Sequence, residues 1–193
     1  MKTFDLFVVE LNKLTKDTIT TESGMELYID TQYNEFEHRV TEGPVVAAPF
    51  KYNTGVEEGD TLYFHHLVVM NDGQPLTGDD NHYLVRYNPD HTVNNQAIAY
   101  KNKKGEITPL GGWVLLTPVE EDSPTQDSSI EVVSFSPPTV TKGRLAFETA
   151  ETDDLSISSG DVVGFPVNRD YSIVIDDQEY YRVRAQDLMY VEG

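Results

Sequence analysis

The chain carries one short pattern twice, VEEGDTLYF at residues 56–64 and ISSGDVVGF at residues 157–165, at an offset of 101. In each copy an aliphatic residue is followed by a Gly-Asp pair and then by an apolar run that ends in Phe. Upstream, TEGPVVA at 41–47 matches TKGRLAF at 141–147 at an offset of 100, and FVV at 7–9 matches WVL at 113–115 at an offset of 106. Because three elements recur in the same order, the sequence predicts two copies of one unit.

The boundary between the two copies is expected near the segment PLGG at residues 109–112, where a Pro and two Gly precede the second opening strand. This gives one unit over residues 1–110 and another over residues 111–193. Each unit contains a long polar loop, at residues 12–32 in the first and 120–138 in the second. Loops of this length without regular structure are often functional.

The apolar residues form short runs with a period of two or with continuous patterning, separated by turn residues, which predicts an all-β fold. Only the segment 185–191 indicates a single helical turn. Asp176-Asp177 is typical of a hairpin turn, because Asp tolerates positive φ. The expected strands cover residues 4–11, 36–48, 61–70, 83–87, 96–101, 113–119, 143–148, 161–167, 171–175 and 180–184.

Composition excludes several classes of function. The formal net charge of −19 excludes a basic nucleic-acid-binding surface, which requires clustered Lys and Arg. No segment approaches the roughly 18 consecutive apolar residues of a membrane span, and the N-terminal segment lacks the pattern of a signal peptide. With no Cys in the chain, disulfides and thiolate metal sites are excluded. We therefore expect a soluble cytoplasmic protein without a membrane partner.

No catalytic motif is present: the sequence lacks a Gly-x-Ser-x-Gly elbow, a phosphate-binding Gly-rich loop and a His-Glu-x-x-His helix. The adjacent His65 and His66 are predicted to lie on a strand, where successive side chains point to opposite faces and cannot bind one ion. Trp113, the only Trp, opens the second unit and is expected to pack in the core. The sequence thus predicts a protein that is not an enzyme and has no metal or cofactor.

Four elements resemble the GroES-type, ten-kilodalton co-chaperonin family. TKGRLAF at 141–147 is similar to the strand that follows the mobile loop of that family, and ISSGDVVGF at 157–165 to its valine-x-x-glycine-aspartate signature. DLMYV at 187–191 resembles its closing strand, and SGMELYI at 23–29 lies where the family carries its mobile loop. The resemblance implies two tandem GroES-like small β-barrels that form a homo-oligomeric ring.

The resemblance also implies a partner, a GroEL-type chaperonin ring, which the protein would cap to assist protein folding. An apolar cluster on a flexible loop can dock in a groove of the partner, and the entropy lost on ordering keeps the affinity low enough for release. A buried strand explains the same alternation of apolar residues, so both interpretations stay open. The expected partner-binding residues are Met25, Leu27, Tyr28 and Ile29 in the first loop, and Ile130, Val132 and Val133 in the second.

Two departures from the family leave other functions open. The segments 48–56 and 147–157 are too short for the roof hairpin of bacterial members, a shortening that also resembles phage-encoded co-chaperonins. The second loop lacks the Gly and has Pro137-Pro138 behind it. The alternative is therefore a phage virion structural protein, either decorating the capsid or associated with the head, that reuses the GroES-like fold and contacts capsid proteins. A third hypothesis, a carbohydrate- or peptide-binding β-module, rests only on the eleven Tyr.

Overall fold

A computed structural model describes residues 2–14, 18–20, 26–28, 39–69, 74–76, 81–89, 95–119, 140–169 and 171–192. The chain divides into two compact units, Met1–Gly111 and Gly112–Gly193.

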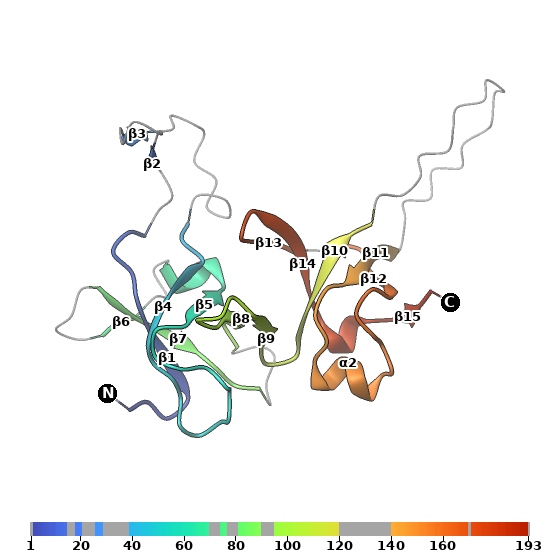
Figure 1. The fold of residues 1–193 in the computed structure, drawn as a ribbon, viewed down its shortest axis with the longest axis horizontal. Helices are drawn as coiled ribbons and strands as arrows, with labels where there is room; N and C mark the ends of the chain where they lie inside the picture. Colours follow the sequence, from blue (N-terminus) through green and yellow to red (C-terminus); the bar gives the residue numbers. More distant parts are fainter. Residues whose placement is uncertain are drawn as a thin grey trace. The chain divides into compact units, whose positions relative to one another are not determined.

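Unit 1 contains a seven-stranded antiparallel sheet with the strand order β6-β7-β1-β4-β5-β8-β9 (Figure 1). A 3-10 helix, η1 (His66–Val69), follows the strand β5, and the short strands β2 (Thr18–Thr20) and β3 (Glu26–Tyr28) pair only with each other. The strands of the large sheet are β1 (Leu6–Glu10), β4 (Glu42–Ala47), β5 (Thr61–Phe64), β6 (Gln74–Pro75), β7 (His82–Arg86), β8 (Ala97–Lys101) and β9 (Ile107–Pro109).

Unit 2 contains a six-stranded antiparallel sheet with the order β13-β14-β10-β11-β12-β15. Its first five positions repeat the order of unit 1, with β10, β11 and β12 in the places of β1, β4 and β5. A short helix, α2 (Ala150–Asp154), and a 3-10 turn, η3 (Ala185–Asp187), complete the unit. The strands are β10 (Trp113–Pro118), β11 (Val140–Leu145), β12 (Val162–Pro166), β13 (Tyr171–Ile175), β14 (Gln178–Arg184) and β15 (Tyr190–Val191).

The all-β prediction is confirmed, with local differences. The expected strand 61–70 ends at Phe64, because Val68 N–H bonds to the carbonyl of His65 (3.0 Å) and begins the 3-10 helix. Helix α2 was not predicted, because it is acidic and buries only Thr152, so it has no apolar period. In the described residues each sheet runs between two edge strands, β6 and β9 or β13 and β15, and shows no closed barrel. The two tandem barrels stay a prediction.

The repeated Gly-Asp pattern forms the same turn in both units. In unit 1, Gly59 N–H donates to the carbonyl of Val45 (2.8 Å), and the Asp60 carboxylate accepts Glu57 N–H (2.8 Å). In unit 2, Gly160 N–H donates to Leu145 (2.9 Å), and the Asp161 carboxylate accepts Ser158 N–H (2.9 Å). Gly59 and Gly160 have φ of +88° and +96°, in the left-handed region that favours Gly. Equal hydrogen bonds around equal glycines explain why the pattern recurs.

The opening strands match at an offset of 107, so the predicted 106 is wrong. Val45 and Leu145 are equivalent at the turn, and they pair with Val9 and Leu116 respectively. A shift by one residue would exchange core and outer faces. The predicted alignment matched Phe7, a core residue, with Trp113, which lies outside the core cluster of its unit.

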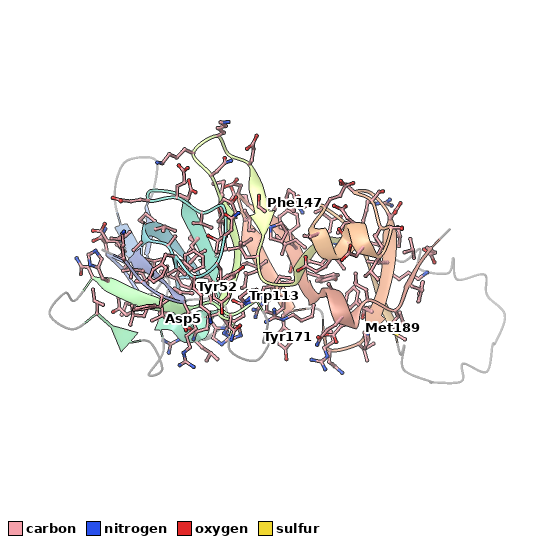
Figure 2. All side chains as sticks on the ribbon, turned by 90° about the horizontal axis from the view of Figure 1, so that it is seen from below. Asp5, Tyr52, Trp113, Phe147, Tyr171 and Met189 are labelled. Atoms are coloured by element: carbon pink, nitrogen blue, oxygen red, sulfur yellow. The ribbon has the colours of Figure 1, made fainter. Side chains whose placement is uncertain are left out.

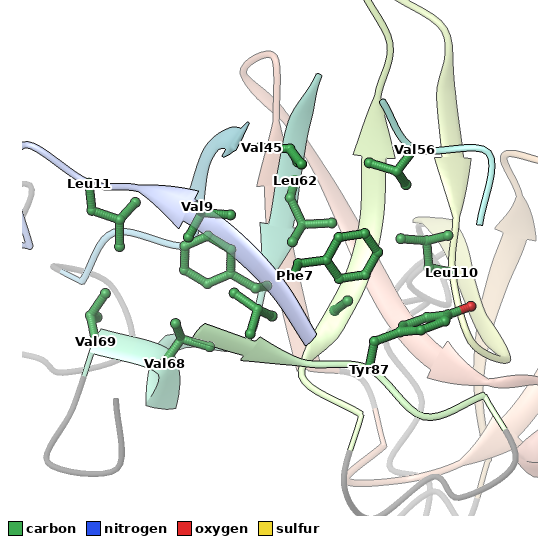
Figure 3. Close-up of a cluster of buried hydrophobic side chains, with 13 residues drawn as sticks. Phe7, Val9, Leu11, Val45, Val56, Leu62, Val68, Val69, Tyr87 and Leu110 are labelled. Carbon is green, nitrogen blue, oxygen red and sulfur yellow. The ribbon is translucent and has the colours of Figure 1, made fainter. Parts of the chain in front are cut away.

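Each unit has its own apolar core. The core of unit 1 includes the fully buried Phe7, Leu62 and Phe64, with the Tyr87 ring edge-on to Phe7 at 5.3 Å between centroids (Figure 3). The core of unit 2 is built on Val114, Leu116, Leu145, Ile157, Val163, Phe165, Val183 and Ala185. Both cores therefore pack around the Gly-Asp turn and the strands next to it.

The junction between the units is a single peptide bond. In unit 1, the buried Asn95 amide donates to the carbonyl of Gly111 (3.2 Å), and in unit 2 Ala185 N–H donates to the carbonyl of Gly112 (3.0 Å). The φ values of Gly111 and Gly112 are +57° and +77°. A Cβ on Gly111 would lie 1.9 Å from the Asn95 amide nitrogen. Gly111 is thus the last residue of unit 1, and Gly112 is the first residue of unit 2.

Gly43 and Gly143 occupy equivalent strand positions where a side chain has no room. A Cβ on Gly43 would lie 2.5 Å from Leu11 Cδ2, and one on Gly143 would lie 2.8 Å from Leu116 Cβ. We expect Gly43→Val and Gly143→Val each to lower the free energy of unfolding by about 1–3 kcal/mol, the range of overpacking effects. Urea unfolding measures this loss. Glu42→Val, at an exposed position of the same strand, is the control, and equal stability of all three variants would contradict the prediction.

Candidate functional site

The two long loops leave and re-enter their sheets at equivalent places. The first connects β1 to β4 and the second connects β10 to β11, and in both cases these strands are direct neighbours. At the base of the first loop, Val40 N–H donates to the carbonyl of Leu14 (3.1 Å), and the Arg39 guanidinium donates to the carbonyl of Val69 (2.9 Å). The base of this loop is therefore fixed to the sheet and to η1.

The base of the second loop is part of the sheet itself. Pro118 pairs with Gly143, and Val140 pairs with Pro166 on the neighbouring strand. The segment 120–139 lies outside the described residues. Because antiparallel neighbours bring their ends together, each loop starts and finishes at one edge of its unit.

Five of the seven predicted partner-binding residues lie outside the described part of the chain. Leu27 and Tyr28 lie on β3, whose backbone pairs Leu27 with Ile19 and Tyr28 with Thr18. The other five predicted residues, Met25, Ile29, Ile130, Val132 and Val133, lie outside the described residues. Their role stays a prediction.

The links between the matched strands differ between the units. In unit 1 the segment 48–56 has no helix or strand. Its Phe50 is 60% exposed and contacts the more exposed Phe4, with the two ring centroids 4.9 Å apart and the rings tilted by 51°. In unit 2 the corresponding segment forms α2, which begins with a capping box between Thr149 and Thr152. The capping residues were the available signal for this helix.

The two adjacent His do not lie on a strand as predicted. His65 follows β5 and His66 begins η1, so their rings lie together, with centroids 4.2 Å apart, instead of on opposite faces. Across the described residues, no group of three or more His, Asp or Glu is arranged to hold a metal ion. The prediction that the side chains of His65 and His66 point to opposite faces of a strand is therefore wrong.

Trp113 does not pack in the core as predicted. The Cζ atom of Arg184 lies 3.5 Å from the centroid of the Trp113 ring, and that of Arg182 lies 5.4 Å from it. The Trp113 side chain is labelled in Figure 2. Burial lowers the pKa of Arg182 to about 10. Burial and then the charge of Arg182 lower the pKa of Arg184 to about 10 as well. The ring therefore serves as a platform for two guanidinium groups.

Comparison with known proteins assigns the family. No family model matches the chain. The chain is 35% identical over 95 residues to a co-chaperonin GroES of Coprothermobacter proteolyticus, and the match covers 96% of that relative. The chain belongs to the GroES co-chaperonin family. The relationship predicted from the Gly-Asp signature and its neighbouring strands is thereby confirmed.

The match to the GroES relative covers 46% of this chain. One whole relative therefore corresponds to less than half of this family member. The comparison gives no support to the phage virion alternative, since the relative is a bacterial co-chaperonin. In the described part of the chain, no helix is long and apolar enough to cross a membrane.

Proposed function

We propose that this GroES-family chain is a co-chaperonin of two tandem GroES-like β-barrel units that caps a GroEL-type chaperonin ring and assists protein folding. The observation that carries the proposal is the 35% sequence identity with a co-chaperonin, which extends over 96% of that relative's length. Both units contain the same Gly-Asp turn with the same hydrogen bonds, which supports the assignment of the family fold to each half.

The proposed contact with the chaperonin is made by the first loop, residues 12–32, through Met25, Leu27, Tyr28 and Ile29. A loop with a fixed base suits this role, because binding then orders only the residues beyond the base. Val40, Arg39 and Leu14 provide that base in unit 1. The second loop, with Ile130, Val132 and Val133, is proposed as an additional contact.

The protein would act by binding and not by catalysis, in the cytoplasm, as a homo-oligomeric ring. A ring presents many identical loops to a ring-shaped partner, so weak contacts add up to a stable complex that can still be released. A long loop with a small apolar cluster fits this mode of binding.

Native mass spectrometry tests the proposal directly. The chain alone should appear as a closed oligomer of one size, and with a GroEL-type chaperonin and nucleotide it should appear as a complex of two rings. Limited proteolysis provides the second measurement, since cleavage within residues 12–32 should become slower in the complex. A monomeric chain that never forms a complex with chaperonin would refute the capping function.

A further inference from the structure

The sheet of unit 2 carries a group of cations and rings on the face opposite its core. Trp113 pairs with Arg184 across the β10–β14 ladder, and Arg182 pairs with Tyr171 across the β13–β14 ladder. Directly paired residues share a face, and alternate residues of β14 share a face, so these four side chains lie together. We call Trp113, Tyr171, Arg182 and Arg184 the Arg–Trp cluster.

Two polar atoms of the cluster lack a partner among the described residues, although the Asp187 carboxylate acts on Arg184. Arg182 is only 6% exposed, and its Nη1 has no hydrogen-bond partner among the described residues. The indole Nε1 of Trp113 is also buried without a partner in that part of the chain. Burying a guanidinium without an acceptor is costly, and a second guanidinium on the same ring adds repulsion. Stacking on Trp113 offsets part of this cost but provides no acceptor oxygen.

The surrounding composition makes this arrangement unusual. The chain has 33 Asp and Glu against 14 Lys and Arg, so carboxylates are abundant, yet none is hydrogen-bonded to Arg182 Nη1 in the described residues. The Cζ atom of Arg182 lies 5.5 Å from the Tyr171 ring, and that ring is 55% exposed. One edge of the cluster is therefore open to solvent.

We propose that the Arg–Trp cluster binds a small oxyanion, a phosphate or a carboxylate, through Arg182, Arg184 and the indole N–H of Trp113. The planar guanidinium presents paired N–H donors that match both kinds of oxyanion. An oxyanion would supply the acceptor that Arg182 and Trp113 lack and reduce the repulsion between the two arginines. All four residues of the cluster belong to unit 2, and the proposal does not rest on the proposed co-chaperonin function.

Thermal unfolding and fluorescence titration of the full chain test the proposal. Sodium phosphate and sodium acetate are the probes, each compared with sodium chloride at the same ionic strength. Because Trp113 is the only Trp, its fluorescence reports on the cluster. We expect a saturable change in Trp113 fluorescence and a rise in Tm of roughly 5 °C at a large excess of the bound anion. Arg182→Met and Arg184→Met should lose both effects, and the exposed Arg86→Met is the control that keeps them.

The two probes distinguish the source of the anion. A response to phosphate alone supports a site for the free ion, whereas a response to acetate supports a site for the carboxylate of an acidic side chain. Without any probe, Arg182→Met should melt at the same temperature as the unsubstituted chain or higher, because an apolar side chain replaces a buried unpaired charge. The proposal is overturned if neither anion gives a saturable response, if Arg182→Met responds as the unsubstituted chain does, or if Arg182→Met melts several degrees lower.

Discussion

Replacing Leu27 and Ile29 with Ser should reduce the affinity for a GroEL-type chaperonin by at least a hundredfold while the isolated protein stays folded. Each aliphatic side chain withdrawn from a buried groove removes about 1.5–3 kcal/mol of favourable burial, and about 1.4 kcal/mol corresponds to a tenfold change in affinity. The fold should survive because β2 and β3 form a sheet of their own and do not pair with the strands that carry the core. Titration of the labelled variant with chaperonin and nucleotide measures the affinity.

The matched control removes two aliphatic side chains elsewhere. Leu155 and Val174 are both 53% exposed, so Leu155→Ser with Val174→Ser should leave chaperonin affinity unchanged. Unfolding of the Leu27 and Ile29 variant would show that these residues belong to a buried strand, the alternative interpretation of the same pattern. A folded variant with full affinity would exclude them as docking residues and leave Ile130, Val132 and Val133 as candidates.

Phe165→Ala should lower the free energy of unfolding of unit 2 by about 3–5 kcal/mol and leave unit 1 nearly unchanged. Phe165 is fully buried, and truncating such a ring leaves a cavity. The two cores share no residue, so the loss should be confined to one unit. Since Trp113 is the only Trp and lies in unit 2, its fluorescence follows that unit alone, and the transition should fall by more than about 10 °C.

Phe64→Ala provides the counterpart in unit 1, where Phe64 is likewise fully buried. Its effect should appear in far-ultraviolet circular dichroism, with the Trp113 transition in place. Equal shifts of both signals in both variants would mean that the chain unfolds as one cooperative body. Hydrogen exchange read by mass spectrometry would then lose protection in both units together.

The sequence predicted the β content and the repeated turn because these depend on local chemistry. The Gly-Asp pair requires positive φ at Gly and a carboxylate that accepts a nearby N–H, and both requirements are visible in the residues. The register of strand pairing was harder to predict from the sequence. Val9 pairs with Val45 next to an irregularity in β1, and the sequence does not reveal which of two adjacent apolar residues faces the core.

Of the two candidate sites, only the long loops could be predicted from the sequence, through the repeat and the family resemblance. The placement of the long loops between neighbouring strands followed from the repeat, whereas the Arg–Trp cluster did not. Arg182 and Arg184 approach Trp113 through pairing of β14 with β10, residues that lie about 70 positions apart in the sequence. The net charge of −19 gave no indication of two neighbouring arginines on one Trp ring.

The single peptide bond between Gly111 and Gly112 has a consequence for symmetry. Covalently joined units cannot be incorporated separately, so the proposed closed ring would contain an even number of units. The two loop sequences then alternate around the ring, and the true rotational symmetry has half the order of the apparent one. If both loops of every chain bind, a partner ring with an odd number of identical subunits cannot be matched loop for loop, and at least one contact stays unmade. If only the first loop binds, the number of contacts equals the number of chains, which can be odd.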